Sequence, residues 1–120
     1  MDNTEFIADQ FAKELLKSNI ESYRDMLART DPSKAVRVYA EAVLAMRKLS
    51  GEDQDAIISF LRVVASDTAS QIFGVIGGSS DLEGVLEDFS LYYGREEISE
   101  NLQDEFLAAS EQIIDLKPNN

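Results

Sequence analysis

The sequence predicts an all-α protein, a compact antiparallel bundle of four to five helices in a single domain that spans residues 1–120. Over long stretches, apolar residues recur at steps of three and four, which is the spacing of one buried helix face. The links near residues 30–32, 50–52 and 77–80 are short, and short links make consecutive helices antiparallel neighbours. A chain of 120 residues also fits one domain and leaves little room for a second.

Two helices are expected in the first half of the chain. The first runs from about residue 3 to residue 29, with Asn3 or Thr4 as its N-cap. The second runs from about residue 32 to residue 50, because Asp31 is a good N-cap and Pro32 suits the first helical position. Gly51 is expected to stop this second helix, since glycine adopts the left-handed conformation at low cost.

A third helix is expected from about residue 52 to the glycines at positions 77 and 78. Helical spacing gives it one long stripe, formed by Ile57, Leu61, Val64, Thr68, Ile72 and Val75. Further apolar residues widen this stripe, and a stripe so broad is typical of a central, buried helix. The third helix is therefore expected to be the most buried element of the bundle.

Residues 79–94 fit two structures. Helical spacing favours a short helix, but Phe89, Leu91 and Tyr93 alternate as in a strand. A short β-hairpin around 71–93, which would pair about 71–77 with 87–93, therefore stays open beside the helix, and Phe89 is expected in the core in either case. The last helix is expected from about Ser99 to Leu116, where apolar residues step regularly by three and four.

The composition excludes several classes of site. The chain has no Cys, no His and no Trp, so it has no disulfide, no thiolate nucleophile, no imidazole base and no His-ligated metal. The glycine-rich segment 74–80 lacks the Lys of a phosphate-binding loop. Residues 79–90 resemble a calcium loop only in part, because Ser79 and Ser90 occupy its first and last ligand positions. We therefore expect no metal, no cofactor and no enzymatic activity.

The charge is uneven along the chain. Eleven basic and 23 acidic residues give a net charge of −12. Residues 1–62 hold nine basic and eleven acidic residues, whereas residues 63–120 hold two basic and twelve acidic ones, a net charge of −10. Nucleic acid and anionic membranes are disfavoured as partners, because both require a basic surface. A basic protein partner is favoured, although acidic surface charge also serves solubility alone.

A cytoplasmic location is expected. The chain begins with acidic and polar residues rather than the basic and apolar segments of a secretory signal. The densest apolar region, residues 56–76, is interrupted by Arg62 and Asp67, so a membrane span is not expected.

The expected partner-binding residues lie in the C-terminal half. Tyrosine offers a large, rigid contact area and is enriched in interface hot spots, and carboxylates around it attract a basic partner. Three of these carboxylates, at positions 97, 100 and 104, are expected on one solvated face of the last helix. The set consists of Tyr92 and Tyr93 as anchors, with Asp88, Glu96, Glu97, Glu100 and Asp104 as steering charges.

These observations favour a non-catalytic, acidic protein-binding module, in its most concrete form an inhibitor or immunity-type protein that covers a basic surface such as that of a nuclease toxin. A first alternative is a self-assembling structural helical protein, for instance a homodimer, because the third helix could exceed what one small bundle buries. A second is a carboxylate- or metal-dependent enzyme, which is disfavoured because a solvated carboxylate is a poor general acid at neutral pH.

Overall fold

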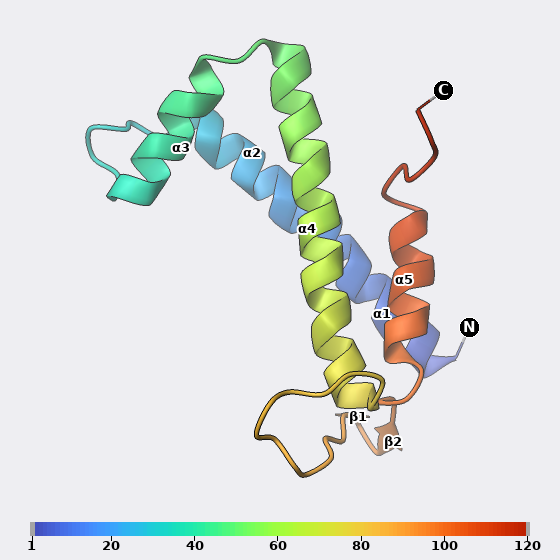
Figure 1. Cartoon of the computed structure of the whole chain (residues 1–120). Coiled ribbons are helices and arrows are strands. Elements are labelled where there is room, and N and C mark those ends of the chain that lie inside the picture. Colours follow the sequence, from blue (N-terminus) through green and yellow to red (C-terminus); the bar gives the residue numbers. More distant parts are fainter. Residues whose placement is uncertain (1, 120) are drawn as a thin grey trace.

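The computed structural model describes residues 2–119 and is mostly helical, at 64%, with four helices and one small antiparallel sheet (Figure 1). The all-α expectation is confirmed at this level. In chain order the elements are α1 (Asn3–Ala12), the π-helical segment η1 (Lys13–Ser18), α2 (Asn19–Arg29), α3 (Arg37–Arg47), α4 (Gly51–Gly77), β1 (Tyr92–Tyr93), β2 (Glu96–Glu97) and α5 (Leu102–Glu111).

The first expected helix is present over its full length, because α1, η1 and α2 follow one another without a break. Its N-cap is Asp2 rather than Asn3 or Thr4, and the Asp2 side chain accepts a hydrogen bond of 2.8 Å from the Glu5 amide. A π-helical turn frees backbone groups from the regular ladder. Here the carbonyl of Leu16 accepts a hydrogen bond of 3.0 Å from Nε of Arg62, which ties η1 to α4.

The second helix is shorter than expected. Asp31 and Pro32 form a turn, because Oδ1 of Asp31 accepts hydrogen bonds from the amide and the hydroxyl of Ser33, and helix α3 begins only at Arg37. The expectation for Gly51 is wrong, since Gly51 is the first residue of α4. Ser50 caps that helix by accepting a hydrogen bond of 3.1 Å from the Asp53 amide.

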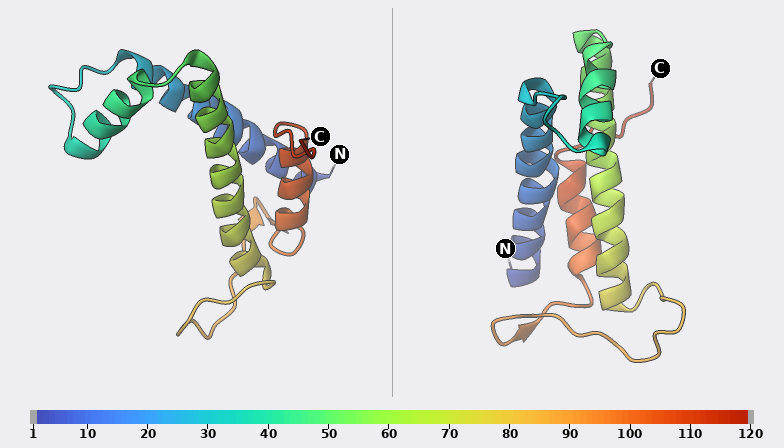
Figure 2. Two further views of the ribbon diagram at one scale, coloured as in Figure 1. Left: turned by 45° about the horizontal axis from the view of Figure 1, so that its top comes forward. Right: turned by 90° about the vertical axis from the view of Figure 1, so that its left-hand side faces the viewer.

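The expected compact bundle is not confirmed. The Cα radius of gyration is 17.3 Å, whereas a compact chain of this length has a radius of about 13.6 Å. Figure 2 shows the reason: α3 and the end of α2 project away from the part of the molecule where α1, α4 and α5 pack together. The molecule is therefore extended, and much of its apolar side-chain surface remains uncovered.

The main core lies between α1, α4 and α5. Phe73 of α4 stacks between two other rings, at 5.3 Å from Phe11 and 5.1 Å from Phe106, the latter edge-on. Such edge-to-face pairs stabilise the core beyond the area that they bury. The buried side chains of this cluster are Ala8, Ala12, Leu16, Ala69, Phe73, Ile98, Leu102, Phe106 and Ile114.

Helix α4 packs with the opposite face from the one expected. Its buried residues are mostly small: Ile58, Ser66, Ala69, Ser70, Phe73 and Gly74. In the expected stripe, Ile57, Val64 and Ile72 are instead 45%, 46% and 55% exposed. The physical reason is close approach. A Cβ atom on Gly77 would lie 2.6 Å from the carbonyl oxygen of Ser99, so only a face of small residues can contact the segment before α5.

Residues 79–91 form neither the favoured helix nor the alternative strand. Gly78 ends α4 with a φ of 85°, and the amides of Ser79 and Ser80 both donate to the carbonyl of Gly74. This left-handed glycine cap turns the chain away from the helix axis. A hairpin does form, but from Tyr92–Tyr93 and Glu96–Glu97, and residues 71–77 remain helical.

The last helix is also shorter than expected. Helix α5 covers Leu102–Glu111, whereas the apolar spacing predicted a helix from about residue 99 to residue 116. Buried Ile98 and Ser99 lie between β2 and α5, where both are hydrogen-bonded to Leu91 instead of continuing the helix.

One helix, α4, is long and apolar enough to cross a membrane when length and composition alone are considered. A core helix of a soluble protein passes the same test, so a single such helix is weak evidence. Only 28% of the apolar window is buried, and α4 is thus an apolar helix with a large uncovered surface.

Substituting Gly77→Ala should lower the free energy of unfolding by about 1–3 kcal/mol, because the added methyl group would overlap the Ser99 carbonyl. Urea denaturation followed by circular dichroism measures this change. The matched control is Gly51→Ala, since nothing lies within 4 Å of a Cβ there, and it should be neutral or stabilising by about 0.4–1 kcal/mol. Equal effects of both substitutions would contradict the close contact.

Candidate functional site

The β-hairpin holds the two expected tyrosine anchors. Tyr92 pairs with Glu97 and Tyr93 with Glu96, around a turn in which Gly94 has a φ of 61°. A positive φ at this first turn position is the pattern of a type II′ turn, for which glycine is the favoured residue.

The hairpin is fastened at its base. The amide of Leu91 donates a hydrogen bond of 2.7 Å to the buried hydroxyl of Ser99. The amide of Ile98 donates in turn to the carbonyl of Leu91, at 2.9 Å. Because Ile98 is also in the core, the strands are anchored to the packed end of the molecule.

The pairing register divides the expected site into two faces. Directly opposite residues of an antiparallel pair project to the same side of the sheet. Tyr92 and Glu97 therefore share one face, while Tyr93 and Glu96 share the other. Glu96 accepts a hydrogen bond of 2.7 Å from the side-chain amide of Asn3, so the face of Tyr93 and Glu96 is the one joined to the start of α1.

The acidic residues do not form the expected ladder on one helix face. Glu97 belongs to β2, Glu100 to the following turn and Asp104 to the first turn of α5. The sequence spacing suggested one helix because Ile98, Leu102 and Phe106 continue the helical apolar pattern. Ile98 is buried for another reason, which is that it ends the hairpin.

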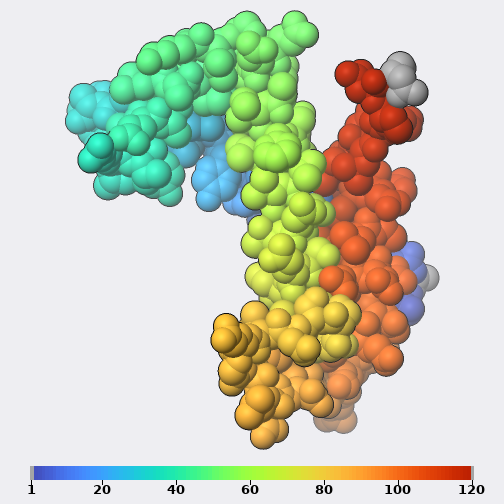
Figure 3. Space-filling model, in the orientation of Figure 1, coloured from blue at the N-terminus to red at the C-terminus, as the bar shows by residue number. Residues whose placement is uncertain are grey.

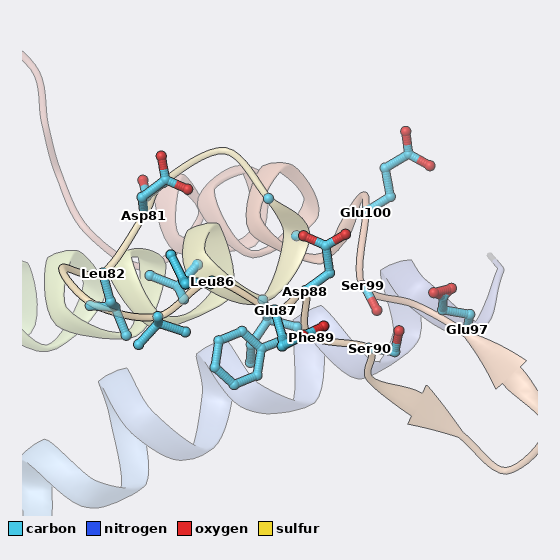
Figure 4. A pocket seen from close by; sticks show the side chains of 16 residues that line it. Asp81, Leu82, Leu86, Glu87, Asp88, Phe89, Ser90, Glu97, Ser99 and Glu100 are labelled. Carbon is cyan, nitrogen blue, oxygen red and sulfur yellow. The ribbon is translucent and has the colours of Figure 1, made fainter.

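A shallow pocket of about 440 Å³ lies between the hairpin base and the loop of residues 78–90 (Figure 4). Three expected site residues line it: Asp88, Glu97 and Glu100. Tyr92, Tyr93, Glu96 and Asp104 are exposed and lie outside its lining. The structure thus brings Asp88 together with Glu97 and Glu100, although they come from separate segments of the chain.

We call residues 78–90 the pocket loop. Its apolar side chains were not predicted as part of the site. Leu86 is 94% exposed and Phe89 is 46% exposed, so the expectation that Phe89 lies in the core is wrong. Both residues line the pocket together with Leu82. The density of turn-forming residues around Gly84 is the signal in the sequence that could have identified this segment as a loop.

The acidic residues of this region lack neutralising partners. Residues 81–104 contain eight acidic residues and one basic residue, Arg95. The salt bridges found within residues 2–119 join Arg24 to Glu21 and Asp55, Arg37 to Glu41, and Arg62 to Glu21, all outside this region. We call the hairpin, the pocket loop and the first turn of α5, residues 81–104, the acidic end.

The geometry of the acidic end does not resemble a metal centre. In Figure 4, Asp81 lies far from Glu97 and Glu100 across the pocket. Within residues 2–119, no group of three or more Asp and Glu side chains is arranged to hold a metal ion. The arrangement presents negative charge outward over a broad surface.

Two side chains with a shifted pKa lie at the opposite end of the molecule from the candidate site. The pKa of Asp31 is lowered, chiefly because its carboxylate accepts a hydrogen bond from the Ser33 side chain. The pKa of Arg24 is raised, chiefly because its guanidinium donates a hydrogen bond to Asp55. Both groups stabilise local structure near α2 and α3 and lie outside the candidate site.

Comparison with protein-family models, with curated proteins and with solved structures finds no match to this chain.

Substituting Ser99→Ala should loosen the hairpin and lower the free energy of unfolding by about 1–3 kcal/mol, because the Leu91 amide would lose its buried acceptor. Hydrogen exchange should show faster exchange at the amides of Leu91 and Ile98. Ser90→Ala, at an exposed position of the same segment, is the control and should leave both amides unchanged. Unchanged exchange in the Ser99 variant would show that this hydroxyl does not fasten the hairpin.

Proposed function

We propose that this protein is a non-catalytic binding module whose acidic end docks a basic protein partner, in the manner of an inhibitor or an immunity protein. The observation that carries the proposal is the excess of unneutralised carboxylates over residues 81–104. Complementary charge accelerates encounter and selects partners of opposite sign.

Geometry supports a docking role in a second way. Both tyrosines, with Glu96 and Glu97, lie on a hairpin whose base is hydrogen-bonded to buried Ser99, so this part of the surface is held in one shape before binding. A preorganised surface loses less conformational entropy on association. Tyr92 is 58% exposed and shares its face with Glu97, an aromatic anchor beside a steering charge.

The pocket loop adds apolar contact area to the charged surface. Leu86 and Phe89 are exposed beside Asp88, and interfaces of stable complexes combine an apolar centre with a polar rim. The proposed partner is therefore a protein with a basic rim around an apolar or aromatic contact. A cytoplasmic setting for this complex remains a prediction from the sequence.

The triple substitution of Glu96, Glu97 and Glu100 to Gln should weaken binding to a basic partner by about tenfold at low salt, with a smaller effect at high salt. Isothermal titration with a synthetic Lys- and Arg-rich peptide measures the affinity, and pull-down from the native lysate at low and high salt identifies the partner. The charge-matched control changes Glu14, Glu41 and Glu52 to Gln, which lie outside the acidic end. If both triple variants bind equally, net charge rather than the acidic end determines binding.

Once the partner is in hand, Tyr92→Ala should raise its dissociation rate more than Tyr93→Ala, because only Tyr92 shares a face with Glu97 and the pocket side of the hairpin. An aromatic hot spot contributes about 2 kcal/mol or more, which is at least a 30-fold change in affinity. Surface plasmon resonance measures the rate. A larger effect at Tyr93 would assign docking to the face joined to α1.

A further inference from the structure

The uncovered face of α4 requires a separate explanation from the acidic end. We call the set Ile57, Leu61, Val64, Thr68, Ile72 and Val75 the outward stripe. Its members are exposed or half-buried and lie on the side of α4 opposite the buried Ser66, Ala69 and Phe73. In Figure 1, the continuous helix made of α1, η1 and α2 crosses behind α4. The right-hand view of Figure 2 shows no helix of residues 2–119 beyond α4 on the other side.

The spacing of the outward stripe is that of a helix that packs against a second helix. Ile57, Leu61 and Val64 are separated by four and three residues, and Thr68 follows after four more. The full series of steps is four, three, four, four and three, and steps of three and four keep every member on one face of the helix, as in helices that pack against a second helix. The stripe from Ile57 to Val75 is about 27 Å long at 1.5 Å per residue.

The molecule as a whole exposes more surface than a compact monomer of its mass. The solvent-accessible surface is 8720 Å², whereas a folded monomer of 13.4 kDa exposes about 6500 Å². The excess of about 2200 Å² lies within the range that each subunit contributes to an obligate homodimer, about 1000–2500 Å². In Figure 3, the arm of α3 and the loop at residues 78–90 both project to one side of α4, so part of the excess belongs to these segments as well as to the outward stripe.

Charge determines which way a second copy would lie. The segment 29–48, near the start of α4, contains five basic and two acidic residues, a net charge of +3. The acidic end lies at the other end of α4 and contains one basic and eight acidic residues, a net charge of −7. Parallel packing would bring two acidic ends together, whereas antiparallel packing brings each acidic end near the basic segment of the other copy.

We propose that two copies of this chain associate through the outward stripe of α4, with the two α4 helices antiparallel. Each stripe covers the other, and residues 29–48 of one copy lie near the loop 81–88 of the other. The hairpin face of Tyr92 and Glu97 is not part of the seam. The loop 81–88 belongs to the acidic end, so the dimer uses part of the charge of that end and leaves the hairpin face for the docking function proposed above.

Analytical ultracentrifugation of the full chain at micromolar concentration should give twice the chain mass of 13.4 kDa. Val64→Glu places a charge from each copy near the middle of the seam and should give the monomer mass. Circular dichroism should show an unchanged helix content, because Val64 lies outside the core. Leu116→Glu, an exposed apolar position outside α4, is the matched control and should remain dimeric. A monomeric wild-type chain overturns the proposal.

The orientation has a direct test, because the chain contains no cysteine. Disulfides form only where Cα atoms lie about 4.4–6.8 Å apart. In the antiparallel dimer, a mixture of Ile57→Cys and Val75→Cys should form a disulfide between the two variants under mild oxidation, and neither variant alone should form one. Disulfides within each variant alone would show parallel packing and overturn the orientation.

Vesicle flotation separates the dimer from the membrane alternative that the length and apolarity of α4 raise. With neutral phosphatidylcholine vesicles, the wild-type chain should remain unbound. If the wild-type chain instead inserts into these vesicles and Val64→Glu does not, the dimer proposal is overturned. Loss of peptide binding in the triple Gln variant with the dimer intact would affect only the docking proposal. The Val64→Glu variant is expected to lose the dimer and to keep its binding of the basic peptide.

Discussion

The close packing of small residues on one face of α4 is the constraint on which the rest of the structure depends. Gly77 contacts the Ser99 carbonyl so closely that a Cβ would lie 2.6 Å from it, and Gly74 is equally close to Gln103. The Gln103 amide also donates to the carbonyl of Ser70, at 2.9 Å, so α4 and α5 are joined by hydrogen bonds as well as by the Phe73–Phe106 contact. Because this face of α4 is the one that packs, Ile57, Val64 and Ile72 of its other apolar face remain exposed.

The same contact positions the acidic end. Ser99 lies against Gly77 and also accepts the hydrogen bond from Leu91 that fastens the hairpin. The left-handed turn at Gly78 sends the chain outward into the pocket loop, so Asp88, Glu97 and Glu100 meet around one pocket. The molecule thus presents an apolar surface along α4 and a charged surface at the C-terminal end of that helix.

The sequence predicted the helices better than their packing. The extent of the first and third helices followed from regular spacing, but spacing alone cannot tell which of two apolar faces of α4 is buried, because close approach depends on a glycine meeting a distant carbonyl. Ile98 continued the pattern of α5 although it belongs to the hairpin, and the expected ladder of Glu97, Glu100 and Asp104 was wrong for that reason. Tyr92 and the acidic residues were identifiable from charge and residue type, whereas the pocket arises from the course of the loop.

Thiol labelling around one turn of α4 shows which face of this helix is packed, because the natural chain has no competing cysteine. The single variants Val64→Cys, Ser66→Cys and Thr68→Cys would be labelled at a dilution at which ultracentrifugation gives the mass of one chain, so that a second copy does not cover the helix. If the face with Ser66 is packed, positions 64 and 68 should be labelled rapidly. Position 66, which is buried, should be labelled at least about tenfold more slowly. Rapid labelling at position 66 with protection at positions 64 and 68 would contradict the account.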